Sequence, residues 1–162
     1  MNAGLESALD KAQLVYQDLV DIANDMVEGY TEPIDKLLNN AKDNVIAITN
    51  DQIRELLFRL SLCGWQFSDI KEKAALRRDC MTALKDEAYA KAFNSVEGAQ
   101  GAKQQQALLA TQDELLAEVL CDLVASLLKT KLDELHRIVD TLKTILTTRL
   151  TEAKLNVTVV GD

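Results

Sequence analysis

The last third of the chain, from about Ala102 to Leu155, contains neither proline nor glycine and places an apolar residue at every third or fourth position. At 1.5 Å per residue, one continuous helix over this range is roughly 80 Å long. Such a helix cannot cover its own apolar face, because residues three and four positions apart lie on one side of it. It must therefore pack against other helices, from its own chain or from another. The sequence predicts an all-α fold: a helical bundle or antiparallel coiled-coil hairpin with a long C-terminal helix.

The apolar positions of this final helix form one line from residue 124 to residue 150. Val124, Leu135 and Leu146 are eleven residues apart, which favours straight or slightly right-handed packing over strict heptads. A short polar stretch, Gln104-Gln105-Gln106, carries no apolar stripe, so we expect the first turns to fray. The predicted helix-packing residues are Val124, Leu128, Leu132, Leu135, Val139, Leu142, Leu146 and Leu150.

Two shorter helices are expected before residue 49. The first runs over about 5–27, and Gly29 is a suitable C-terminal stop. Thr31 then caps a second helix, which reaches about Ile46 and tolerates Pro33 in its first turn because that position needs no amide donor. We therefore expect residues 1–48 to form a helical hairpin.

A second hairpin is expected over residues 49–155, continuous with the first in one domain. Thr49 and Gln52 have the spacing of a capping box, which starts a short helix that Gly64 ends. Ser68 caps the next helix, which reaches about Phe93. Two glycines in the segment 94–101 then predict a turn before the long final helix, and the β-branched residues 156–162 predict a loose tail.

Charge, cysteine content and hydropathy exclude several functions. The formal net charge is −8, whereas non-specific nucleic-acid binding needs a cationic surface that releases counterions, so direct binding is not expected. Three cysteines without Cys-x-x-Cys spacing favour a reducing cytoplasm. No apolar run approaches the about 18–20 residues of a membrane span, so we expect no membrane contact.

Catalytic chemistry has few candidate residues. His136 is the only histidine, and Asp140 four residues later predicts a surface ion pair rather than an acid–base pair. Carboxylates recur at helical spacing, as in Asp113, Glu114 and Glu118, but without histidine among them they are typical of a solvated face rather than a metal site. We expect no catalytic residues, no metal and no cofactor, and therefore no enzyme.

One segment could contact a ligand or a partner. Trp65 follows Gly64 between two predicted helices, where we expect it to close the end of the bundle; an exposed Trp65 would instead be an interface anchor. Basic residues follow it, but interleaved acids favour a salt-bridged, solvated helix. If this strip does bind a nucleotide phosphate and base, the binding residues are Trp65, Lys71, Arg77, Arg78 and Tyr89.

Residues 49–155, about two-thirds of the chain, show a likeness in helix order. A short helix ends near an aromatic residue, and a long helix closes on Ala88-Tyr89-Ala90-Lys91-Ala92-Phe93. A turn with Glu97-Gly98, a polar Lys/Gln segment and a leucine-rich helix ending near Thr147-Thr148-Arg149 follow. This order resembles small helical accessory proteins of tailed bacteriophages, often encoded among DNA replication and recombination genes. The resemblance implies a phage or prophage protein that acts in the host cytoplasm.

Two functions remain open at this point. The first is a non-enzymatic assembly or interaction protein, which binds other copies of itself as a homo-oligomer and a replication or recombination protein. The second is an anti-defence protein that sequesters a nucleotide signal or inhibits a host enzyme.

Overall fold

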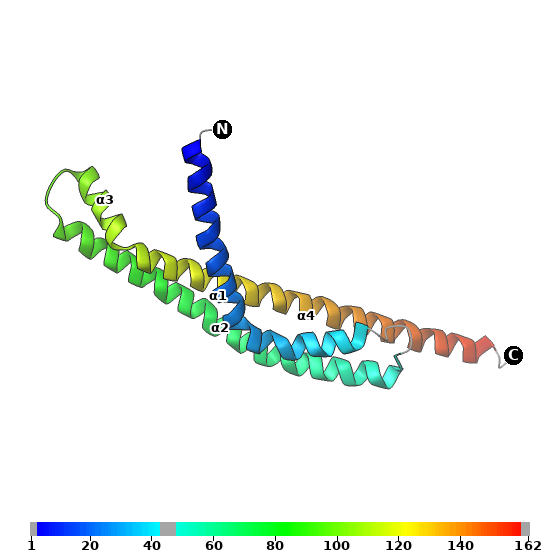
Figure 1. Ribbon diagram of the computed structural model, residues 1–162. Coiled ribbons are helices and arrows are strands. Elements are labelled where there is room, and N and C mark those ends of the chain that lie inside the picture. Colours follow the sequence, from blue (N-terminus) through cyan, green and yellow to red (C-terminus); the bar gives the residue numbers. More distant parts are fainter. Residues whose placement is uncertain (1–2, 43–47, 160–162) are drawn as a thin grey trace. The chain divides into compact units, whose positions relative to one another are not determined.

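The computed structural model describes the backbone of residues 3–42 and 48–159 and the side chains of residues 11–39 and 48–155. Over this range the chain forms four helices: α1 (Ala3–Lys42), α2 (Asn50–Ser95), α3 (Gln100–Ala110) and α4 (Gln112–Val159) (Figure 1). The predicted all-α fold is confirmed. Tertiary contacts divide the chain into two units, to which α1, α2 and α4 each contribute a part.

Unit 1 comprises Met1–Glu28 and Ile70–Leu128. In it, the second half of α2 runs antiparallel to the first part of α4, because Lys85 pairs with Glu118 whereas the earlier Arg78 pairs with the later Asp122. Small side chains form much of its core, and small side chains let helices approach closely. The buried residues are Ala23, Val27, Ala107, Thr111, Ala125 and Leu128.

Unit 2 comprises Gly29–Asp69 and Lys129–Asp162 and has the larger apolar core. Its buried side chains come from all three of its helical segments: Ile34, Leu38, Ile53, Leu56, Leu60, Phe67, Leu132, Leu135 and Val139. The predicted apolar line of the last helix therefore does face the interior from Leu128 to Val139. Farther along the line, Leu142 and Leu146 are half-buried and Leu150 is exposed, and Val124 at its start is half-buried.

The start of α2 confirms the predicted capping box. The Thr49 amide donates to Gln52 Oε1 at 2.7 Å, and the Gln52 amide donates to Thr49 Oγ1 at 3.2 Å. These two bonds satisfy amides that a helix start leaves without partners. Nearby, Arg149 Nη1 of α4 donates to the Ile48 carbonyl at 2.6 Å, which ties the residue before the cap to the C-terminal helix of unit 2.

The predicted break at Gly29 is wrong, because α1 continues through it and holds Pro33 in its interior. Gly29 does not adopt a positive φ, so it makes no left-handed helix end. Proline at 33 lacks the amide that would bond to the carbonyl four residues earlier, and its ring crowds that carbonyl, yet the helix continues past it. In place of the expected hairpin within residues 1–48, the structure has a single helix over Ala3–Lys42. The second predicted helix was expected to end near residue 46, which lies outside the described residues.

The predicted break at Gly64 is also wrong. Gly64 is buried inside α2, and a Cβ atom added there would lie 3.1 Å from Cδ2 of Leu135. Its missing side chain thus permits close contact between α2 and α4 instead of a turn. Ser68 consequently lies within the helix and does not cap one.

The last helix begins later than expected, since α3 and α4 are separate helices joined at Thr111. The Thr111 side chain is buried and its hydroxyl donates to the Ala107 carbonyl at 2.9 Å. In Figure 1, α3 turns away from the axis of α4. The predicted turn after Phe93 is confirmed: α2 ends at Ser95, α3 begins at Gln100, and Gly98 between them has a φ of 131°. At the other end α4 includes residues 156–159, which we expected to be a loose tail.

Candidate interaction surfaces

An apolar stripe lies on the outside of α2 in unit 2. Phe58, Leu62 and Trp65 are 71%, 49% and 76% exposed, and their spacing of four and three residues places them on one face of the helix. We call these three residues the aromatic stripe. The buried residues of the same helix segment, from Ile53 to Phe67, point to the opposite side, because successive residues turn by about 100°.

The expectation that Trp65 closes the bundle is wrong. Because α2 continues through Gly64, Trp65 is turned away from the line that packs on α4. Phe67, only 2% exposed, occupies the interior instead. The exposed position of Trp65 matches the alternative that we considered, an anchor for a binding partner.

Exposed ion pairs flank the stripe at the start of α2. Arg54 contacts Asp51 at 2.8 Å, and Arg59 contacts Glu55 at 2.6 Å. All four side chains are more than half exposed, and pairs of this kind contribute little to stability. They leave the guanidinium groups accessible at the Phe58 end of the stripe.

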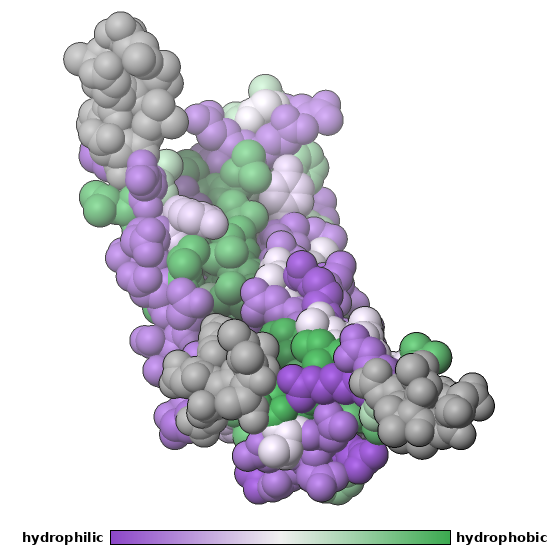
Figure 2. All heavy atoms as spheres, turned by 90° about the vertical axis from the view of Figure 1, so that its right-hand side faces the viewer, coloured by the Kyte–Doolittle hydropathy of each residue, from purple (hydrophilic) through white to green (hydrophobic). Residues whose placement is uncertain are grey.

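A second apolar surface lies at the junction of α3 and α4 in unit 1. It consists of exposed large side chains, which we call the leucine run: Leu108, Leu109, Leu115, Leu116 and Val119. Both leucines of each adjacent pair are at least 42% exposed. Neighbouring residues of a helix differ by about 100° in direction, so a narrow contact cannot cover both members of such a pair. That spacing is the sequence signal for this surface, which our sequence analysis missed. Figure 2 views the side of the molecule that lies at the right of Figure 1, and on that face too hydrophobic residues lie among hydrophilic ones.

The leucine run belongs to a segment with acidic side chains and no basic ones. Between Gln104 and Leu128 the sequence has Asp113, Glu114, Glu118 and Asp122 but neither lysine nor arginine. The first two lie in the first turn of α4, where the positive end of the helix dipole favours carboxylates. Large apolar side chains and negative charge therefore occur together at this end of α4.

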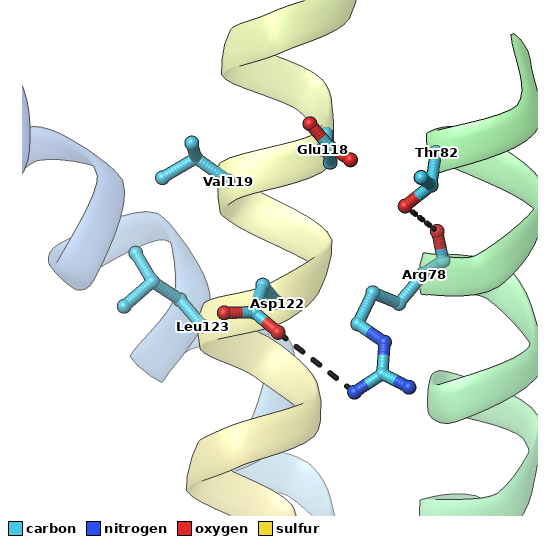
Figure 3. A pocket seen from close by; sticks show the side chains of 6 residues that line it. All are labelled: Arg78, Thr82, Glu118, Val119, Asp122 and Leu123. Carbon is cyan, nitrogen blue, oxygen red and sulfur yellow. Dashed lines mark hydrogen bonds and ion pairs between the residues drawn. The ribbon is translucent and has the colours of Figure 1, made fainter. Parts of the chain in front are cut away.

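Two of these carboxylates bridge to α2, Glu118 to Lys85 and Asp122 to Arg78, and Figure 3 draws the second of these bridges. Lys85 Nζ lies 2.9 Å from Glu118 Oε2, and both side chains are at most one-quarter exposed. The hydrogen bond from Lys85, followed by one from Thr82, holds the pKa of the Glu118 carboxyl below 4.5. The same pair raises the pKa of Lys85 above 10.5. The bridge therefore stays charged over the whole neutral range and fixes the register of the two helices.

An open cavity of about 290 Å³ adjoins this bridge. Figure 3 shows Arg78 and Thr82 entering it from α2 and two carboxylates from α4. Arg78 bonds to Asp79 at 2.8 Å and lies 3.8 Å from Asp122, and the hydrogen bond to Asp79 raises the pKa of the guanidinium. With carboxylates already around its one cation, this cavity offers little attraction to a phosphate.

The residues that we selected as a ligand site are divided between the units. Trp65 belongs to unit 2, whereas Lys71, Arg77, Arg78 and Tyr89 belong to unit 1. Lys71 Nζ lies 3.1 Å from Glu72, and the Tyr89 ring stacks on Phe93 with 6.2 Å between centroids. Arg77 lines a smaller cavity with Met26, Ala74, Leu120, Cys121 and Val124, separate from the residues that surround Arg78.

The described residues include no group of three or more His, Cys, Asp or Glu side chains placed to hold a metal ion. Asp140, the expected partner of His136, pairs with Lys143 at 3.3 Å. Within the described ranges, no helix combines the length and hydropathy that crossing a bilayer requires. Comparison of the chain with protein-family models, curated proteins and solved structures found no match.

Proposed function

We propose that this protein is a non-enzymatic helical interaction protein that binds a second protein through the leucine run. The observation that carries the proposal is the exposure of five large apolar side chains within twelve residues, at the junction of two helices. Contiguous apolar surface is costly in water, and on soluble proteins it commonly marks a binding site.

The charge of the same segment supports a basic partner. Between residues 104 and 128 it has four acids and no bases. Glu118 and Asp122 already face Lys85 and Arg78 of α2, so the negative charge offered to a partner comes mainly from Asp113 and Glu114. Opposite charge on the partner accelerates association and selects against acidic competitors. Proteins that handle DNA carry the cationic surfaces that phosphate contacts require. The resemblance in helix order favours the same class, a replication or recombination protein of a phage, bound in the host cytoplasm.

The anti-defence alternative, sequestration of a nucleotide signal, has less support. Arg78 is the one cation that lines the larger cavity, and it is bonded to Asp79 and faces Asp122. A phosphate that enters this cavity would have to displace those carboxylates. Thermal-shift measurements with linear and cyclic nucleotides test this alternative directly. A concentration-dependent rise in melting temperature that Arg78→Ala abolishes would favour it over the interaction role.

Binding to purified partners tests the proposed function. The probes are a phage single-strand-binding protein, a helicase loader and a strand-annealing protein, immobilised for interferometry. We expect one of them to bind the full chain with an affinity that falls as salt rises. The double variant Leu109→Ser/Leu116→Ser should abolish that binding. Leu84→Ser is the matched control, because Leu84 is similarly exposed, at 54%, but lies on α2.

Binding that survives in the leucine-run variant would contradict the proposed site. Failure of all three probes to bind the wild-type chain would contradict the proposed partner class.

A further inference from the structure

The aromatic stripe is an apolar surface separate from the leucine run. It holds the only tryptophan of the chain and one of its three phenylalanines, and both rings are more than 70% exposed. Tryptophan is enriched among the residues that contribute most to protein interfaces. We propose that the stripe binds the same stripe on a second copy of this chain, with the two α2 helices antiparallel. This proposal rests on the interaction role above and names the partner of a different surface.

The exposed area of the stripe suits an interface of ordinary size. A buried aromatic side chain removes about 150–250 Å² from water, so the exposed parts of Phe58, Leu62 and Trp65 amount to roughly 400 Å². A standard interface buries about 800 Å² on each partner, of which somewhat more than half is apolar. The stripe therefore supplies nearly all the apolar area that one copy contributes to such an interface, and the exposed polar residues beside it supply a rim.

The order of residues along the stripe makes it complementary to itself. Leu62 lies between the two aromatic residues, four positions after Phe58 and three before Trp65. In an antiparallel pair with a two-fold axis near Leu62, Phe58 of one copy lies beside Trp65 of the other, and symmetry repeats the contact. Aromatic pairs of this kind contribute beyond their area.

The charges at the two ends of the stripe favour the antiparallel orientation. Arg54 and Arg59, paired with Asp51 and Glu55, flank the Phe58 end, and Asp69, which has an interaction of its own, follows the Trp65 end. Antiparallel packing places Arg54 opposite Asp69 of the second copy, whereas parallel packing places each arginine opposite itself. Both arginines now pair with exposed carboxylates of the same helix. Exchanging such a partner for a carboxylate of the second copy costs little free energy, because exposed ion pairs contribute little to stability.

Sedimentation velocity on the full chain tests the proposal. We expect a concentration-dependent dimer, and Trp65→Ala should weaken it about 30-fold or more, as truncation of an interface hot spot does. Leu62→Glu places two like charges at the axis and should give a monomer. Leu84→Glu is the control, because it adds the same charge at an exposed position of α2 outside the stripe. Far-ultraviolet circular dichroism shows that each variant is folded.

Charge exchange tests the symmetry and the orientation. A mixture of Leu62→Glu and Leu62→Lys chains should form a heterodimer, because position 62 faces itself across the axis. A mixture of Phe58→Lys and Trp65→Glu chains should also associate if the helices are antiparallel, since each lysine then faces a glutamate. Failure of the second mixture, with success of the first, would overturn the antiparallel arrangement.

Two results would overturn the second copy as the occupant. One is a wild-type chain that stays monomeric at about 100 μM, because interfaces of ordinary size have dissociation constants that are micromolar or lower. The other is a dimer that Leu62→Glu leaves unchanged. Neither result bears on the leucine run. A monomer that still binds a replication protein would contradict the dimer but support the proposed function, and a dimer that binds none of the probes would support the dimer alone.

Discussion

The contact between Gly64 and Leu135 allows a test in which Gly64→Ala lowers the free energy of unfolding when Leu135 is present and raises it when Leu135 is replaced by alanine. Gly64 is buried in the interior of α2, and an added Cβ would lie 3.1 Å from Cδ2 of Leu135, which is 1% exposed. Alanine stabilises a helix interior by about 0.8–1.0 kcal/mol relative to glycine. A methyl group forced into a packed core costs about 1–3 kcal/mol. Since Leu135 is buried and its Cδ2 must shift by a few tenths of an ångström to admit the methyl group, we expect Gly64→Ala to lower the free energy of unfolding by about 1 kcal/mol.

Removing the leucine side chain should reverse this effect. Leu135→Ala alone should cost about 2–5 kcal/mol, the range for truncation of a buried leucine. In that background the methyl group of Gly64→Ala meets a cavity, so only the gain in helix propensity remains. We then expect Gly64→Ala to raise the free energy of unfolding by about 1 kcal/mol. The coupling energy of the double-mutant cycle is about 2 kcal/mol, within the range found for residues in contact.

Urea unfolding of the four chains, followed by circular dichroism at 222 nm, measures the cycle. The slope with denaturant must be the same in each chain, because the two units could otherwise unfold separately. If Gly64→Ala changes the free energy of unfolding equally in both backgrounds, the close approach of α2 and α4 at this point is refuted. A stabilisation by Gly64→Ala alone would show that Leu135 can move aside.

Three further predictions follow from contacts in the two units. The pKa of Glu118 is lowered from 4.5 by Lys85, so this pair stabilises the fold fully above pH 4.5 and loses its contribution as the pH falls through the lower, folded pKa. Glu118→Gln should therefore flatten the acid limb of stability against pH, and an unchanged limb would exclude a role for the pair. Thr49→Ala should cost about 1 kcal/mol in urea unfolding, because it removes the hydroxyl that caps α2; no loss would mean that water replaces it. Phe67→Ala should cost about 3–5 kcal/mol of stability, because Phe67 is buried. Trp65→Ala, measured in chains dilute enough to be monomeric, should change stability by less than about 0.5 kcal/mol. Equal losses would contradict the opposite orientations of the two side chains.

Local chemistry predicted part of this fold correctly. The Thr49–Gln52 capping box depends only on residues three positions apart, and both of its hydrogen bonds form. The apolar line of the last helix was readable because its period extends over many turns, and Leu128, Leu132, Leu135 and Val139 are all buried. Signals of these two kinds need no knowledge of what lies across the helix.

The helix breaks were mispredicted because glycine has two different uses. In a turn it adopts a positive φ, as at Gly98 between α2 and α3; within a helix it lets a neighbouring helix approach, as at Gly64. The sequence around Gly64 does not distinguish these uses, because the decisive partner, Leu135, lies 71 positions later. Thr111 is the converse case, a residue without a turn signature whose buried hydroxyl accompanies the end of α3.

The same misprediction concealed the aromatic stripe. If α2 ended at Gly64, Phe58 and Trp65 would belong to different elements and could not form one face. Once α2 is continuous, its segment in unit 2 has two apolar faces on opposite sides, one buried from Ile53 to Phe67 and one exposed from Phe58 to Trp65. A helix with a single neighbour needs only one apolar face. The buried face packs within unit 2, whereas the proposed dimer is what would give the exposed face its contact.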